Sequence, residues 1–529
     1  MCINEDNVLF KSLFRSNYVD KTGIISFLNK LIDTENRFVC VTRARRFGKS
    51  ATARTLNAYY SKGCDSKELF SNLEIAKDPD FETHLNKHDV IFLDMQSYEP
   101  ATSSDETYLQ CFNRKLTHEL VEQYPELASE QEPVYLNEIL PRTGRKFIFI
   151  IDEWDFPIER YKDDPAFIEK YLDVLRRLFK ETTCTNSISL VYMTGILPLI
   201  RFDSQSSLNN FIEFTMANSG PIAKFCGYTE DEVAKLCREH NLDLDKVRLW
   251  YKGYRFGEYT VYNPFEISRL VWMQDYFPYW SHTATCGYMK NAISNDFGTL
   301  HDDLIRLCAG DKISNLDLLS MNNLNTHLNN KDAVLLYLVT LGYLTYDIET
   351  GSAFPPTEET RNDLVSTIEE LNWQEYKDSL SASNEILESL ILKDEKRASE
   401  LFNLFIKRGF ESNSSLFGSK TELNLKKSVL LSLLATERYY FIPLQNAPSF
   451  KGLADLVYIP KYNYRDDKYK FVIFIRINSK LDTKDAICKI KESESLPMLK
   501  KFADIGLLVN INCEANTQDT VWNIKYVEF

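Results

Sequence analysis

The chain has 529 residues, of which 44% are hydrophobic and 26% are charged, and its formal net charge is −14 at pH 7. This length predicts about two to four domains. The composition excludes fibrous and disordered proteins. The excess of acidic residues argues against a globally basic nucleic-acid binder, but it is compatible with a local basic patch.

The eleven cysteines include no C-x-x-C pair, and the seven histidines show no metal-ligand spacing. This pattern predicts reduced thiols instead of a disulfide framework or a zinc site. The N-terminal stretch MCINEDNVLF lacks a cationic start followed by an apolar run, and no apolar run is long enough to span a bilayer. We therefore expect a soluble cytoplasmic protein with no membrane partner.

The first part of the chain alternates short apolar runs with segments of helical periodicity. Such alternation predicts a parallel sheet covered by helices. The expected strands lie at residues 38–42, 88–95, 146–152 and 187–193, and the expected helices lie at about 50–61, 106–123 and 165–181.

The stretch RARRFGKS directly follows the first expected strand. In a P-loop, backbone N–H groups at a helix N-terminus point at the phosphates, a lysine adds positive charge, and a hydroxyl binds magnesium. Gly48, Lys49 and Ser50 fit these roles, but Arg43 stands where the usual first glycine would be. Taken alone, GKS is weak evidence for this site, since a helix that begins with an exposed lysine is the more frequent origin of such a sequence.

The strongest expected strand, FIFIID, runs into two acids. In the Walker B pattern, the first acid, here Asp152, holds the magnesium shell, and the second, Glu153, orients or deprotonates the attacking water. Thr194 ends the next expected strand, where a polar residue can touch the γ-phosphate or the water. A buried strand that ends in solvated acids is the common alternative. Since ligands bind at this edge of open α/β sheets, the three elements together predict a nucleotide site.

After Phe225 the pattern becomes helical and turn-rich, with a capping-box start at Thr229 and Glu232. A second α/β pattern follows, with helices at 424–437 and 485–493 and strands at 454–460, 470–477 and 505–511. The expected domains are a P-loop domain at 1–224, a helical, winged-helix-like lid domain at 225–360, a helical connector at 361–410 and an α/β domain at 411–529.

Several segments together resemble the bacterial AAA-ATPase-like proteins fused to a C-terminal PD-(D/E)XK nuclease-like domain. They include YVDKTGIISFL, TRARRFGKS, IIDEWDFPI, TGILPLIRFDSQSSLNNF, FCGYTEDEVAKLC, WYKGYRFGEYTVYNP, YWSHTA and LGYLTYD, and the resemblance spans nearly the whole chain. The P-loop of that family typically reads R-P-R-R-F-G-K-S/T, so Arg43 is a family feature and Ala44 replaces the usual proline.

The resemblance implies a P-loop NTPase sheet, a winged-helix-like lid domain and a restriction-endonuclease-like α/β domain. It also implies that ATP or ADP and Mg²⁺ bind at one site, where Glu153, Lys49 and Thr194 would serve catalysis and Ser50 and Asp152 would hold the metal. The residues expected to bind the nucleotide are Arg45, Arg46, Phe47, Gly48, Lys49, Ser50 and Ala51.

The roles of three further polar residues stay open. Asp155 completes a D-E-x-D pattern of the family, and it either positions Arg45 or Arg46 or caps the following turn. Arg255 could reach a phosphate from the lid domain, although a surface arginine in a turn is the preferred interpretation. Arg201 is a weaker candidate for the same role. No arginine finger that acts on another subunit can be assigned.

In the resembled family, the C-terminal domain reads G-x-A-D-I-V, then V-V-E-L-K, then a helix with Q-I-K. This chain keeps Asp455, but Phe474 stands at the metal-binding Glu, Arg476 at the Lys and Lys489 at the Gln. Phenylalanine cannot bind a metal, and one carboxylate alone would hold magnesium poorly. We predict that the nuclease fold is kept and the nuclease chemistry is lost. Glu422 is either the helix carboxylate of a nuclease site or an ordinary acid at a helix start.

A basic set near this degenerate site has two interpretations. It could bind a nucleic-acid backbone without cutting it, or it could be a solvated charged face. The set consists of Arg476, Lys480, Lys484, Lys489 and Lys491.

The leading hypothesis is an ATP-binding and ATP-hydrolysing protein whose nucleotide state controls the nuclease-like domain, with DNA or RNA as its partner. An active ATP-regulated DNA or RNA nuclease and a scaffold that holds nucleotide without turnover are the alternatives. The oligomeric state stays open.

Overall fold

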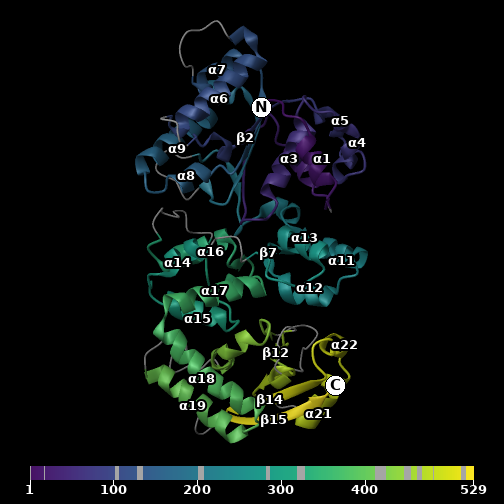
Figure 1. The fold of residues 1–529 in the computed structure, drawn as a ribbon, viewed down its shortest axis with the longest axis vertical. Helices are drawn as coiled ribbons and strands as arrows, with labels where there is room; N and C mark the ends of the chain where they lie inside the picture. Colours follow the sequence, from purple (N-terminus) through teal and green to yellow (C-terminus); the bar gives the residue numbers. More distant parts are fainter. Residues whose placement is uncertain are drawn as a thin grey trace.

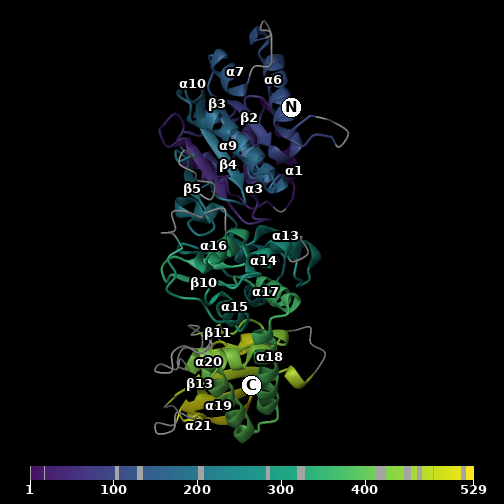
Figure 2. The same ribbon diagram turned by 90° about the vertical axis from the view of Figure 1, so that its left-hand side faces the viewer.

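The computed structural model arranges the chain in three tiers along its longest axis (Figures 1 and 2). The N-terminal tier contains the P-loop, the middle tier is mainly helical, and the C-terminal tier contains a second large sheet. The structure describes residues 2–16, 18–101, 106–127, 135–199, 208–280, 286–318, 328–411, 425–445, 454–461, 467–479, 482–513 and 520–529.

The N-terminal tier is built on a five-stranded sheet in the order β2-β3-β4-β1-β5. All neighbouring strands run parallel, which confirms the predicted parallel sheet. Parallel strands need crossover helices that cover both faces, and accordingly β1, β3 and β4 are buried along their whole length. The strands are β1 (Phe38–Thr42), β2 (Asp89–Asp94), β3 (Phe147–Asp152), β4 (Ile188–Gly195) and β5 (Ile212–Phe214).

Helices lie on both faces of this sheet, as Figure 1 shows for α3 and α9. They are α1 (Val8–Phe14), α2 (Gly23–Asn29), α3 (Lys49–Tyr60), α4 (Lys67–Phe70), α5 (Phe81–His84), α6 (Tyr108–Gln123), α7 (Leu136–Arg142), α8 (Phe156–Arg160), α9 (Pro165–Lys180) and α10 (Thr182–Thr185). A 3-10 turn, η2 (Met95–Tyr98), follows β2 directly.

The middle tier combines helices with a three-stranded antiparallel sheet, β6-β8-β7, and a β9-β10 hairpin. Its first helix starts where the capping box predicts, because the N–H of Thr229 donates to the Glu232 carboxylate at 2.7 Å. The elements are β6 (Tyr228–Thr229), α11 (Glu230–Glu239), α12 (Leu244–Tyr251), β7 (Tyr254–Phe256), β8 (Tyr259–Tyr262), α13 (Pro264–Met273), α14 (Cys286–Ile293), α15 (Leu300–Cys308), α16 (Lys331–Leu341), β9 (Thr345–Asp347), β10 (Ser352–Phe354) and α17 (Glu358–Leu371).

The C-terminal tier contains a five-stranded sheet in the order β11-β12-β13-β14-β15, in which β13 and β14 run parallel and the other pairs antiparallel. Its elements are α18 (Gln374–Ile391), α19 (Glu395–Glu411), α20 (Leu425–Ser432), β11 (Leu444–Gln445), β12 (Leu456–Tyr458), β13 (Val472–Ile477), α21 (Thr483–Lys491), α22 (Leu496–Leu499), β14 (Ile505–Cys513) and β15 (Thr520–Glu528).

Helix α19, which the sequence places in a connector, packs against β15. The rings of Phe402 and Trp522 lie 5.2 Å apart, and the N–H of Thr520 donates to the Asn403 side chain at 3.0 Å. Helix α19 therefore packs on the C-terminal sheet and belongs to the same tier. Across the described ranges, none of the helices has both the length and the apolar character needed to cross a membrane.

Candidate nucleotide-binding site

The loop between β1 and α3 has the backbone of an anion cradle. Arg46 and Gly48 both adopt left-handed conformations, with φ of 70° and 82°. Alternation of left- and right-handed residues turns successive N–H groups towards one concave side. In the structure, no side chain caps the N-terminus of α3, so its first N–H groups stay available for a ligand.

Lys49, Ser50 and Asp152 meet at one edge of the sheet. The Lys49 side chain is buried, and its Nζ donates to the Ala44 carbonyl at 3.3 Å. Burial raises the pKa of the Asp152 carboxyl to about 6, the Ser50 hydroxyl and the Lys49 charge act in the opposite direction, and the Glu153 charge adds to the increase. The structure thus brings together the ammonium, hydroxyl and carboxylate that the sequence singles out.

These groups fit a magnesium ion that is shared with phosphates. Asp152 is 6% exposed, and its Oδ1 is buried without a hydrogen-bond partner. Mg²⁺ prefers oxygen ligands and is usually held by one or two carboxylates together with substrate phosphates and water. Accordingly, in the part of the chain that the structure describes, no group of three His, Cys, Asp or Glu side chains could hold a metal by itself.

Glu153 follows Asp152 in a left-handed conformation with φ of 56°. Its neighbour Trp154 is fully buried, and the Trp154 Nε1 donates to the Leu197 carbonyl at 3.0 Å. Because non-glycine residues adopt this conformation at an energetic cost, its presence next to a ligand site suggests a functional constraint. The turn leaves Glu153 partly exposed between two buried residues, where it can reach water.

The side chains of Thr194 and Asp155 both form hydrogen bonds with the protein backbone. The Thr194 hydroxyl donates to the Val41 carbonyl at 2.7 Å, so in this arrangement its one hydrogen does not reach a phosphate. Asp155 accepts the N–H groups of Ile196 and Leu197 at 2.9 and 2.7 Å. Of its two interpretations, the structure therefore favours the turn cap, although the capped turn is the one after β4.

Arg43 has a structural role that explains why it replaces glycine. Its guanidinium is 1% exposed and donates to the carbonyls of Thr42 and Phe214 at 2.7 and 2.8 Å. It also lies 5.0 Å from the centre of the Phe256 ring. Arg43 thus joins β1 to β5 and to the middle tier.

The next three P-loop side chains contact aromatic rings of the middle tier. The guanidinium carbons of Arg45 and Arg46 lie 6.0 and 4.4 Å from the ring centres of Tyr288 and Phe265. The Phe47 ring meets the Tyr254 ring edge-on, with centroids 4.8 Å apart. The loop therefore lies between its own sheet and the middle tier.

Arg255 is not brought to this loop. It lies on β7 between Tyr254 and Phe256, whose rings face Phe47, and side chains alternate along a strand. Arg255 instead donates to the Thr260 hydroxyl at 2.8 Å and pairs with Asp347 at 3.7 Å. Arg201 lies outside the described residues.

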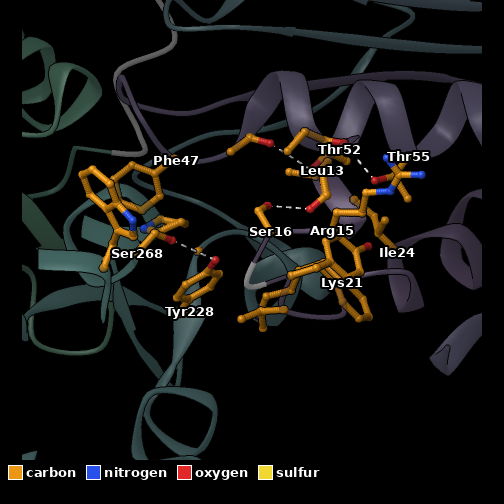
Figure 3. Close-up of a pocket in the computed structure, with 18 residues that line it drawn as sticks. Leu13, Arg15, Ser16, Lys21, Ile24, Phe47, Thr52, Thr55, Tyr228 and Ser268 are labelled. Carbon is orange, nitrogen blue, oxygen red and sulfur yellow. Dashed lines mark hydrogen bonds between the residues drawn. The ribbon is translucent and has the colours of Figure 1, made fainter. Parts of the chain in front are cut away.

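A cavity of about 450 Å³ borders the same end of α3 (Figure 3). Sequence reasoning missed it, because segments far apart in the chain form its walls and no local pattern reports such a meeting. On one wall the Tyr228 and Ser268 hydroxyls are 3.3 Å apart. The lining consists of Leu13, Arg15, Ser16, Tyr18, Val19, Lys21, Ile24, Phe47, Gly48, Ala51, Thr52, Thr55, Phe225, Gly227, Tyr228, Pro264, Ser268 and Trp272.

In the C-terminal tier, Asp455 and Phe474 are part of the folded sheet. The Asp455 carboxylate accepts the N–H of Ile477 at 2.8 Å. Phe474 is fully buried and packs edge-on against Phe529, with centroids 6.1 Å apart. Phe474, which the sequence resemblance places opposite a metal-binding Glu, is therefore part of an apolar core.

The basic set does not form one exposed patch among the described residues. Arg476 is 2% exposed, and burial lowers the pKa of its guanidinium although the charges of Asp455 and Asp482 act in the opposite direction. By contrast, Lys484, Lys489 and Lys491 are exposed on α21. Glu422 and Lys480 lie outside the described residues.

The comparison with protein families matches the N-terminal tier. A family model described as "Predicted AAA-ATPase" covers residues 9–204. This part of the chain is similar to AAA-ATPase-like domains. The match includes the P-loop, Asp152, Glu153 and Thr194, and it ends before the middle and C-terminal tiers.

A relative from Azotobacter chroococcum mcd 1, "Uncharacterized protein in vnfD 5'region", is 26% identical over 288 residues. The alignment covers 52% of each protein, so the chain spans about half the length of this relative. No solved structure matches.

Proposed function

We propose that the N-terminal tier binds and hydrolyses ATP at the edge formed by α3, β3 and β4. The supporting observation is the meeting of Lys49 and Ser50, at an uncapped helix N-terminus, with the buried Asp152 carboxylate. Bound Mg²⁺ would neutralise phosphate charge there, held by Ser50 and Asp152. Lys49 neutralises phosphate charge, and Glu153 orients or deprotonates the attacking water.

The cavity beside α3 suits the nucleoside part of the ligand. It begins at Gly48, where the phosphates would lie, and its walls include Tyr18, Phe47 and Tyr228. Ligand pockets of this size class are mainly apolar, with a few polar groups that fix orientation. The hydroxyls of Tyr228 and Ser268 provide such groups.

The nucleotide state would control the C-terminal tier through α17. On one side, Glu359 accepts the N–H of Trp280, whose indole Nε1 donates to the P-loop carbonyl of Arg45 at 3.4 Å. On the other side, the adjacent Glu358 accepts the N–H of Ile442 at 2.9 Å. Because one helix turn contacts the C-terminal tier directly and the P-loop through Trp280, a shift of the P-loop upon nucleotide exchange can move the C-terminal sheet.

We further propose that the C-terminal tier keeps a nuclease-like fold without cleavage and binds a partner, with DNA or RNA as the first candidates. The burial of Phe474 supports the loss of the metal site. Among the described residues of the basic set, the exposed lysines of α21 are the ones that can reach a phosphate backbone.

ATP turnover by the full chain tests the main proposal. Lys49→Ala should lose nucleotide binding, because it removes the buried ammonium at the cradle. Glu153→Gln should still bind ATP but hydrolyse it about 10²- to 10⁴-fold more slowly, since a general base contributes about that much. Equal turnover in all three proteins would refute the assignment, and binding without turnover in the wild type would favour the scaffold hypothesis.

A further inference from the structure

A third acid lies next to the Walker B acids. Strand β2 ends at Asp94, which is paired in register with Asp152 on β3. Neighbouring parallel strands lie about 4.8 Å apart, and side chains at the same register point to the same face. The sequence predicts the strand, but it singles out no role for Asp94, because no recognised motif includes this residue.

Asp94 is held in place and remains accessible. Its Oδ1 accepts the N–H of Gln96 at 3.0 Å, which caps the 3-10 turn η2. The side chain is exposed, and a carboxylate can accept several bonds besides this one. Its charge also acts on Asp152, so the two carboxylates are electrostatically coupled.

An independent observation points to a cation at this edge. The Oδ1 of Asp152 is buried and lacks a hydrogen-bond partner, although buried acceptors are normally satisfied. Two neighbouring carboxylates and Glu153 would repel one another without positive charge between them. The hydroxyl of Ser50 lies at the same carboxylate.

We propose that Asp94 is a positioning residue of the metal site, which acts through its charge and through water on a divalent cation held by Asp152 and Ser50. This inference rests on the proposed ATP–Mg²⁺ function. Carboxylates outside the first ligand shell commonly orient ligands and waters of a bound metal. Asp94 would thus tighten the site without touching the nucleotide.

The test uses Mn²⁺ as the probe and follows its binding to the full chain with ADP by electron paramagnetic resonance. Asp94→Asn keeps the acceptor for the N–H of Gln96 and removes only the charge. It should raise the Mn²⁺ concentration for half-saturation about tenfold or more, while ADP affinity in the presence of chelator stays unchanged. Asp94→Ser, which also has an N-capping oxygen, should show the same shift.

Asp163→Asn is the matched control, because Asp163 is an exposed acid of the same tier beyond α8, and it should leave Mn²⁺ binding unchanged. Normal Mn²⁺ binding in both Asp94 variants would overturn this inference alone. Absence of ADP binding by the wild type, with and without metal, would overturn the proposed function and the inference with it.

Discussion

Asp155 is only 1% exposed. Its carboxylate accepts two N–H groups of the turn after β4. Burial raises its pKa from 3.8 to about 6. The folded state therefore binds this proton more tightly than the unfolded state does. The stabilisation of the folded state by this bound proton is complete below about pH 4. It is lost as the pH rises through about 6, and at higher pH the free energy of unfolding no longer depends on this group.

Asp155→Asn should remove this titration and keep an oxygen acceptor for the turn. The free energy of unfolding of the wild type, relative to the variant, should fall by on the order of 3 kcal/mol between pH 4 and pH 7. Urea unfolding at several pH values measures this difference, in which the titration of Asp152 cancels because both proteins contain it. A difference independent of pH would contradict the buried, proton-binding carboxyl.

At the same scale, the sequence predicts which residues lie together at the candidate site better than it predicts the contacts that each one makes. Gly48, Lys49 and Ser50 lie where the P-loop pattern places them, since local backbone geometry decides their position. The task of Arg43 could not be read from the pattern, because its acceptor at Phe214 is distant in the chain. Asp94 was missed for the same reason, since its importance comes from pairing with another strand.

Among the elements, the buried strands β1, β3 and β4 match their predicted ranges within about two residues, because continuous apolar runs identify fully buried strands. Strand β15 was not predicted. Its buried residues alternate with less buried ones from Thr520 to Lys525, and the alternation breaks at Tyr526. Side chains of α19 complete its edge. The cavity beside α3 was also beyond prediction, since its walls form only when four segments that are separate in the chain meet.

Helix α17 provides an element-scale prediction. Glu358 and Arg361 are both 1% exposed and pair at 2.6 Å, and Lys461 joins Glu358 at 2.8 Å. Arg361 also donates to the Tyr440 carbonyl at 2.9 Å. Glu358→Gln would leave the buried Arg361 and the half-buried Lys461 without the carboxylate that they share, which should lower the free energy of unfolding by about 3–5 kcal/mol.

Urea unfolding followed by circular dichroism checks this value. Glu370→Gln is the matched control on the same helix, because Glu370 is 63% exposed and pairs only with Lys290 among the described contacts. This control should change stability by less than about 1 kcal/mol. Similar losses in both variants would contradict a special role for the buried network.

At the scale of the whole molecule, the three tiers lie in chain order and the middle tier separates the P-loop from the C-terminal sheet (Figure 1). Local sequence patterns predict elements but not this stacking, which depends on contacts such as Trp280 with Arg45 and Glu358 with Ile442. The proposed control of the C-terminal tier depends on these contacts between tiers.

Trp280→Phe tests this transmission. The variant keeps a ring against Tyr343, 5.0 Å away in the wild type, but loses the indole bond to the P-loop. Nucleotide should bind no more than about fivefold more weakly. Hydrogen exchange at residues 437–445 should respond to ATP and Mg²⁺ in the wild type and respond much less in the variant. Equal responses would show that this contact does not carry the coupling.

The most direct measurement of the central claim is a crystal structure of the full chain with ADP and Mg²⁺. We predict that the β-phosphate lies on the N–H groups of Gly48, Lys49 and Ser50, with the metal between Ser50 and Asp152 and the base in the cavity beside Phe47. Nucleotide bound elsewhere on the molecule, or a P-loop that stays empty at saturating ADP, would contradict the account.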